Sequence, residues 1–167
     1  PRWGIADSLR YPLLLAPLMA DDSVEVVEQK LNLVGKYIEI FAVRRSVNFR
    51  NFGASSIRYT MYSLVKEIRR KSVEELRAIL SKQVAAMSET WNGVSSFRLH
   101  GQNGRFVKFL LSRISGFIDK EAGQSTDFVD YYENPNAKPF EIEHIWANKF
   151  AQHRDEFDQE HEFLECR

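Results

Sequence analysis

An acid and an imidazole stand side by side near the end of the sequence, at Glu143 and His144. Residues 140–145 alternate, with one exception, between apolar and polar side chains, which predicts a half-buried strand. Neighbouring strand residues point to opposite faces, so this pair can converge on one ion only where the strand ends or bends. A carboxylate can hold a hard cation, and a neutral imidazole can take a proton from water. The alternative is that both side chains are only solvated, as exposed His and Glu usually are.

The run Phe140-Glu141-Ile142-Glu143-His144-Ile145 resembles the start of the HNH (ββα-metal) nuclease motif. It is similar to the motif in the C-terminal half of GmrSD-like, modification-dependent restriction endonucleases. This resemblance implies that His144 is the general base and that Glu143 is a ligand of Mg²⁺ or another divalent cation. It also implies that the substrate is foreign or modified DNA. One departure is Ala147, where many relatives carry proline.

The resemblance covers most of the chain and implies a fragment of the parent protein. No residues match the family's Asn-bearing strand and closing helix before Arg167, and no Gly-rich phosphate loop marks its nucleotide-hydrolysing half. We therefore expect half of a nuclease site, inactive by itself. The expected partners are DNA and either the other half of the same restriction protein or a second copy of the chain.

Before residue 126 the hydrophobic pattern is helical. Apolar residues recur at steps of three and four within 4–20, 23–45, 55–71, 72–87 and 105–121. Ser72 and Glu75 have capping-box spacing, and Lys30 lies off the apolar stripe of its segment. The predicted fold class is mainly α, a bundle of five or six helices followed by the first strand of an incomplete HNH finger. The predicted domains are a helical domain over 1–125 and the start of a nuclease domain over 126–167, with a short strand within 126–138.

Charge is unevenly distributed along a chain whose net charge is zero. Residues 44–120 contain fifteen basic and five acidic groups, and residues 121–167 contain four and twelve. A basic block can hold a polyanion and an acidic block can surround a cation, although the two can also neutralise each other. The residues predicted to contact DNA lie at two helix ends: Arg44, Arg45, Arg69, Arg70 and Lys71. Basic groups at a helix C-terminus also complement its dipole, and this alternative stays open.

The loop 48–53 presents Phe49 and Phe52 on either side of Arg50. Two aromatic rings with an arginine can stack on bases, as in proteins that bind single strands. The alternative is that both rings pack under the following helix.

The composition limits the classes of protein to which the chain can belong. Hydrophobic residues make up 44% and charged residues 28% of the chain, which is typical of a globular protein. No apolar run reaches the roughly 18 residues of a membrane helix. The single cysteine, Cys166, excludes a disulfide within the chain, so we expect a cytoplasmic protein with no membrane partner. The alternative to a nuclease is a non-catalytic helical module that binds the DNA backbone or a partner protein.

Overall fold

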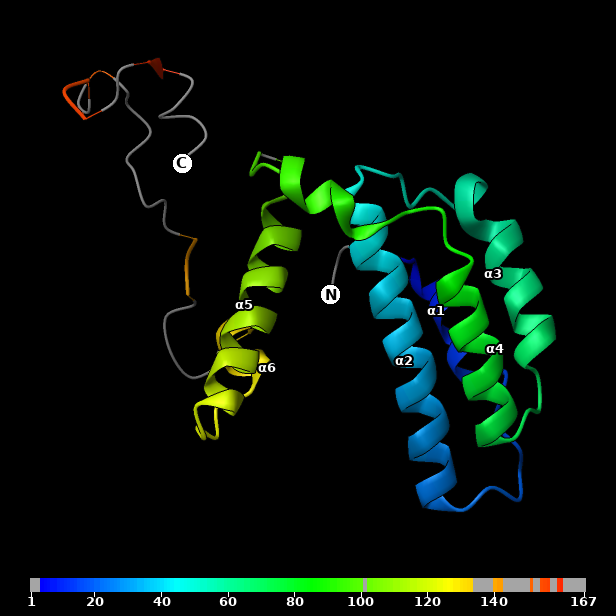
Figure 1. Ribbon diagram of the computed structural model, residues 1–167. Helices are drawn as coiled ribbons and strands as arrows, with labels where there is room; N and C mark the ends of the chain where they lie inside the picture. The colour runs from blue at the N-terminus through cyan, green and yellow to red at the C-terminus, as the bar shows by residue number, and fades with distance from the viewer. Residues whose placement is uncertain are drawn as a thin grey trace. The chain divides into compact units, whose positions relative to one another are not determined.

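The computed structural model describes residues 4–100, 102–133, 140–142, 151, 154–156 and 159–160. In these residues the regular secondary structure is helical, which confirms the mainly α class (Figure 1). The segments are α1 (Asp7–Leu15), α2 (Val24–Val47), α3 (Ala54–Ile68), α4 (Val73–Ala85), the 3₁₀ helix η1 (Trp91–Ser96), α5 (Gly104–Glu121) and α6 (Phe128–Tyr132). The chain divides into two compact units, Pro1–Phe106 and Val107–Arg167, which are described separately. The predicted start of a nuclease domain at residue 126 stays a prediction.

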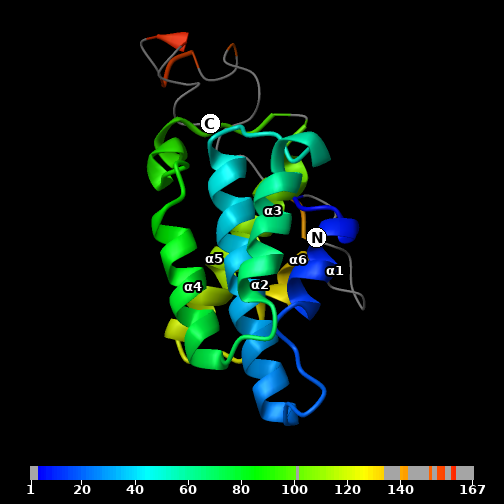
Figure 2. The same cartoon turned by 90° about the vertical axis from the view of Figure 1, so that its right-hand side faces the viewer.

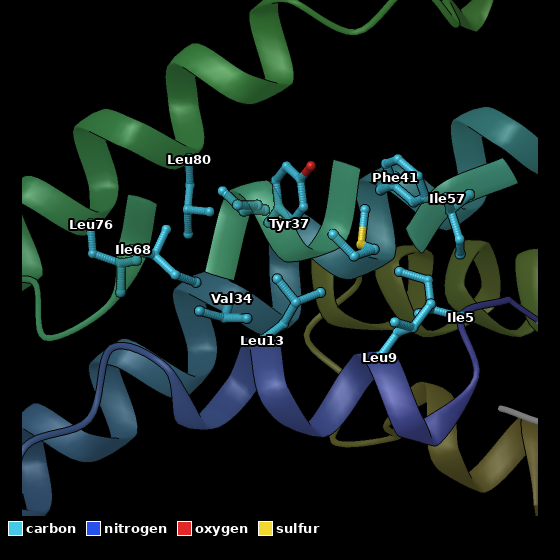
Figure 3. Packing of buried hydrophobic residues seen from close by; sticks show 12 residues of the cluster. Ile5, Leu9, Leu13, Val34, Tyr37, Phe41, Ile57, Ile68, Leu76 and Leu80 are labelled. Carbon is cyan, nitrogen blue, oxygen red and sulfur yellow. The ribbon is translucent and has the colours of Figure 1, made fainter. Parts of the chain in front are cut away.

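Four helices enclose the core of the first unit. Both α1 and α4 contact α2 and α3, so apolar stripes from all four helices meet (Figure 2). Figure 3 shows these side chains converging, among them Leu13 from α1, Val34 from α2 and Leu76 from α4, none of which is exposed. The predicted apolar stripes therefore form the core, because burying apolar area is the main gain in folding such helices.

Local sequence signals fix several helix ends. Ser23 caps α2 by accepting from the Val26 N–H at 3.4 Å, and the predicted capping box of α4 is present, with Ser72 and Glu75 bonded in both directions. At the other end of α2, the N–H of Arg50 donates to the carbonyl of Arg45, two positions after the C-cap. This is a Schellman ending.

Lys30 is buried, although it lies off the predicted apolar stripe of α2. Its ammonium donates to both carboxylate oxygens of Asp22 at 2.8 Å and to the Pro17 carbonyl at 3.0 Å. The side chains of Lys30 and Asp22 are only 1% and 4% exposed. The aliphatic stem adds to the core while the charge is neutralised inside the α1–α2 connection, an arrangement that helical spacing alone does not reveal.

The second unit differs from the sequence prediction in one respect. Residues 128–132 form α6 instead of a short strand, because Asp127 and Asp130 make a capping box at its start. Phe109 of α5 packs edge-on against Phe128 and Tyr132 at ring distances of 6.0 and 5.7 Å. The apolar stripe of α5 continues with Ile114, Phe117 and Ile118, which are exposed. The five-residue α6 is too short to cover the whole stripe.

The Asp22–Lys30 pair predicts an acid-dependent loss of stability. The hydrogen bond from Lys30, and then that from the Met19 N–H, hold the pKa of Asp22 below its ordinary value of 3.8. A carboxyl with a lowered folded-state pKa stabilises the fold above its unfolded-state pKa, and this contribution is lost as pH falls through the folded value. Asp22→Asn should therefore lower stability at neutral pH and flatten its decline between about pH 5 and about pH 2. Urea unfolding across this range measures both effects.

Asp21→Asn is the matched control, since Asp21 is an exposed neighbour of Asp22. Equal pH profiles for the two variants would contradict a stabilising role for the buried pair.

Two glycines predict opposite responses to alanine. A Cβ at Gly93 of η1 would lie 2.5 Å from the Val47 carbonyl oxygen, whereas a Cβ at Gly35 of α2 would meet nothing within 4 Å. Gly93→Ala should destabilise by about 1–3 kcal/mol through overpacking. Gly35→Ala should stabilise by about 0.5–1 kcal/mol, because alanine has less backbone entropy to lose in a helix. Urea midpoints of the two variants should move in opposite directions, and a shift in the same direction would refute this packing.

Candidate nucleic-acid interface

The predicted catalytic pair lies outside the described residues. Glu143 and His144 are both in the stretch that follows Ile142, and the described residues 140–142 belong to no helix or strand. Phe140 is half-exposed, and its ring contacts that of Tyr131 at 5.2 Å. Among the residues with described positions, no three His, Cys, Asp or Glu side chains are grouped as metal ligands. The HNH strand and its metal site therefore stay predictions.

Arg44 is held within the first unit. Its guanidinium donates to the Val84 carbonyl of α4 at 2.9 Å and lies over the Trp91 ring of η1 at 5.3 Å. The Nε atom is buried without a hydrogen-bond partner among the described groups. This arginine joins three helices, which leaves little of its charge for an external phosphate.

Arg45 has a similar internal arrangement. It forms an ion pair with Glu89 at 2.9 Å and donates to the Asn51 carbonyl, and both charged side chains are 14% exposed. Its guanidinium also lies over the rings of Phe41 and Phe52 at 5.4 and 5.9 Å. DNA contact by Arg44 and Arg45 stays a prediction. The structure instead gives both of them intramolecular partners.

The second predicted basic cluster is more accessible. Arg69 and Arg70 are exposed at the end of α3 and line a shallow hollow together with residues that include Leu15 and Val65. The Arg70 N–H donates to the Ala16 carbonyl at 2.9 Å, and its φ of 55° is in the left-handed region. Lys71 is bound to Glu75 at 2.9 Å and lowers the pKa of that carboxyl. Arg69 and Arg70 are therefore better placed than Lys71 to meet an external anion.

The outward face of α3 adds residues that were not assigned to the predicted site. Tyr59 is 86% and Tyr62 is 47% exposed, and the exposed Arg58 and Lys66 lie on the same helix. The sequence signal that identifies them is their position off the buried stripe Ile57, Met61, Leu64 and Ile68. The face combines cations with aromatic rings, the two groups used to bind nucleic-acid strands.

The two aromatic side chains of the loop 48–53 have different environments. Phe52 packs against the core, as the second alternative predicted, but Phe49 is 58% exposed and does not pack under α3. The Phe49 ring stacks on Phe97 at 5.3 Å and on His100 at 5.9 Å. The imidazole Nδ1 of His100 accepts from the Gln102 N–H at 3.3 Å. Phe49, Phe97 and His100 thus form one aromatic stack next to the C-terminal end of α2.

No protein-family model matches the chain, and neither a curated protein nor a solved structure was found to be similar to it. Among the helices that the structure describes, none is both long and apolar enough to cross a membrane.

The internal role of Arg45 predicts a measurable coupling with Glu89. The pair is mostly buried, so Arg45→Gln and Glu89→Gln should each destabilise the fold, with a coupling of about 1 kcal/mol in a double-mutant cycle. Urea unfolding of the two single variants and the double variant gives this energy. Additive effects, together with weaker DNA binding by Arg45→Gln, would instead assign the residue to an external phosphate.

Proposed function

We propose that the chain belongs to a metal-dependent DNA endonuclease of the GmrSD-like restriction type. The observation that carries this proposal is the run Glu143-His144-Ile145 at the end of a strand-like alternation. The mainly helical region before it is consistent with the helical middle part that the resemblance implies. The acidic composition of residues 121–167 also suits a cation site.

The proposed chemistry is hydrolysis of a phosphodiester by in-line attack of water. His144, neutral at the start, takes a proton from the attacking water, so that a new oxygen–phosphorus bond forms as the bond to the leaving oxygen breaks. Glu143 would hold a divalent cation, which supplies charge neutralisation at the phosphate when bound. The neutral form of histidine is well populated near pH 7, because its ordinary pKa is about 6.5.

A second candidate is a non-catalytic helical module that holds a nucleic-acid backbone or a partner protein. The observation that favours it is the exposed set of cations on α3 and at its end. Here the Glu143-His144 pair would be incidental, and replacing it would change little. The two candidates are therefore separated by the response to His144→Ala.

The nuclease proposal predicts that His144→Ala abolishes cleavage and spares DNA binding. Plasmid cleavage in Mg²⁺ or Mn²⁺ is measured for this chain and for a form that carries any residues following Arg167 in its gene. We expect cleavage only from a form that supplies the motif's Asn-bearing strand. The general base should account for at least about a hundredfold in rate. His100→Ala is the matched control, because His100 stacks on Phe49 and has no part in the proposed chemistry.

Metal binding by the form that supplies the Asn-bearing strand gives an independent measurement. Glu143→Gln should weaken Mn²⁺ binding, measured by calorimetry, whereas Glu141→Gln should leave it unchanged. An undiminished cleavage rate in His144→Ala, or equal Mn²⁺ binding by the two glutamine variants, would refute the assigned roles.

A further inference from the structure

The exposed side of α3 forms a continuous surface, which we call the α3 outer face. Its members are Arg58, Tyr59, Tyr62, Lys66 and Arg69, the last being the C-cap residue. At 100° per residue these five positions fall within an arc of roughly 100°. The buried stripe of Ile57, Met61, Leu64 and Ile68 centres roughly 140° around the helix from the middle of this arc. Packing of the core therefore directs all five side chains outward together.

The cations of this face have no partner in the described part of the protein. Arg58, Lys66 and Arg69 make no hydrogen bond or ion pair there, in contrast to Arg45 and Lys71. The one acid on α3, Glu67, lies outside the arc and accepts from Gln83 at 2.8 Å. Among the described residues of α3, the outer face thus carries three positive charges and no acidic side chain.

The two rings define the kind of polyanion that fits. Tyr59 and Tyr62 are one helical turn apart and lie between the cations along the helix. A duplex would offer these rings only its backbone, whereas a single strand also offers unpaired bases that stack on aromatic side chains. A lipid surface is a poor fit, because the arc contains no aliphatic side chain to enter the membrane.

We propose that the α3 outer face binds single-stranded nucleic acid, with Arg58, Lys66 and Arg69 on phosphates and Tyr59 and Tyr62 stacked on bases. This site extends the predicted basic end of α3 to its whole exposed side. It goes beyond the nuclease proposal and does not depend on it, since neither Glu143 nor His144 takes part. In a nuclease, such a surface would hold a displaced or unwound strand.

Binding of a fluorescein-labelled oligo(dT) of about 15 nucleotides tests this site by anisotropy. The buffer contains EDTA, so that cleavage cannot interfere. Arg58→Glu/Lys66→Glu should weaken binding at least about tenfold and reduce the slope of log affinity against log salt. Lys36→Glu/Lys120→Glu makes the same change of net charge at exposed positions on α2 and α5 and should leave affinity within about twofold.

The rings are tested with the charges intact. Tyr59→Ala/Tyr62→Ala should weaken oligo(dT) binding about tenfold or more, while Tyr59→Phe/Tyr62→Phe should retain it, because stacking needs the ring and not the hydroxyl. A duplex of the same length should bind the unsubstituted chain more weakly than oligo(dT) does. Its affinity should not change in Tyr59→Ala/Tyr62→Ala. Circular dichroism confirms that each variant is folded.

Equal affinity of all variants for oligo(dT), or equal binding of single strand and duplex, would overturn the proposal. Tight binding of polyglutamate that is undiminished in Tyr59→Ala/Tyr62→Ala would also overturn the proposal. The ligand of this face would then be an acidic polypeptide. His144→Ala should bind oligo(dT) like the parent chain. A failed cleavage test therefore leaves this site standing, and a failed binding test leaves the nuclease proposal standing.

Discussion

The arrangement of the first unit depends on burial of one apolar face of α3. Ile57, Met61, Leu64 and Ile68 are at most 2% exposed, and burying a side chain of this size gains about 1.5–3 kcal/mol. Exposed charge pairs contribute at most about 1 kcal/mol each, so hydrophobic burial decides the rotation of the helix. Once this rotation is set, the tyrosines and cations of the α3 outer face point away from the core of the first unit. The composition of the α3 outer face is therefore a consequence of how the core packs.

Basic residues serve two different purposes in this protein. Arg44, Arg45 and Lys30 point inward, where their partners are carbonyls, carboxylates and aromatic rings. Arg58 and Lys66 stay in solvent without a described partner. A planar guanidinium can stack on a ring and donate hydrogen bonds at the same time, which suits Arg44 and Arg45 to a crowded helix junction. A count of positive charges along the sequence therefore overstates the charge available to a polyanion.

The C-terminal end of α2 shows how local strain is offset. Phe49 has a φ of 53°, a conformation that favours glycine and costs about 1–2 kcal/mol for other residues. The Schellman bonds made by the N–H groups of Phe49 and Arg50 offset part of this cost. Stacking on Phe97 and His100 compensates further and holds the ring at the surface. The strained position thus orders an aromatic stack that joins the loop after α2 to the segment before α5.

The sequence by itself determined the mainly helical class, the positions of the main helices and the Ser72–Glu75 cap. These features follow from local spacing, because apolar periodicity and capping hydrogen bonds involve residues only three or four positions apart. It also supplied the Glu143-His144 motif, which remains a hypothesis about chemistry. Tertiary structure alone decided that Lys30 is buried against Asp22, that Arg45 pairs with Glu89, and that Ile114 and Phe117 are exposed. Each of these features depends on contacts between different segments of the chain, or on which helix covers which face. The spacing of residues along the sequence does not specify such contacts.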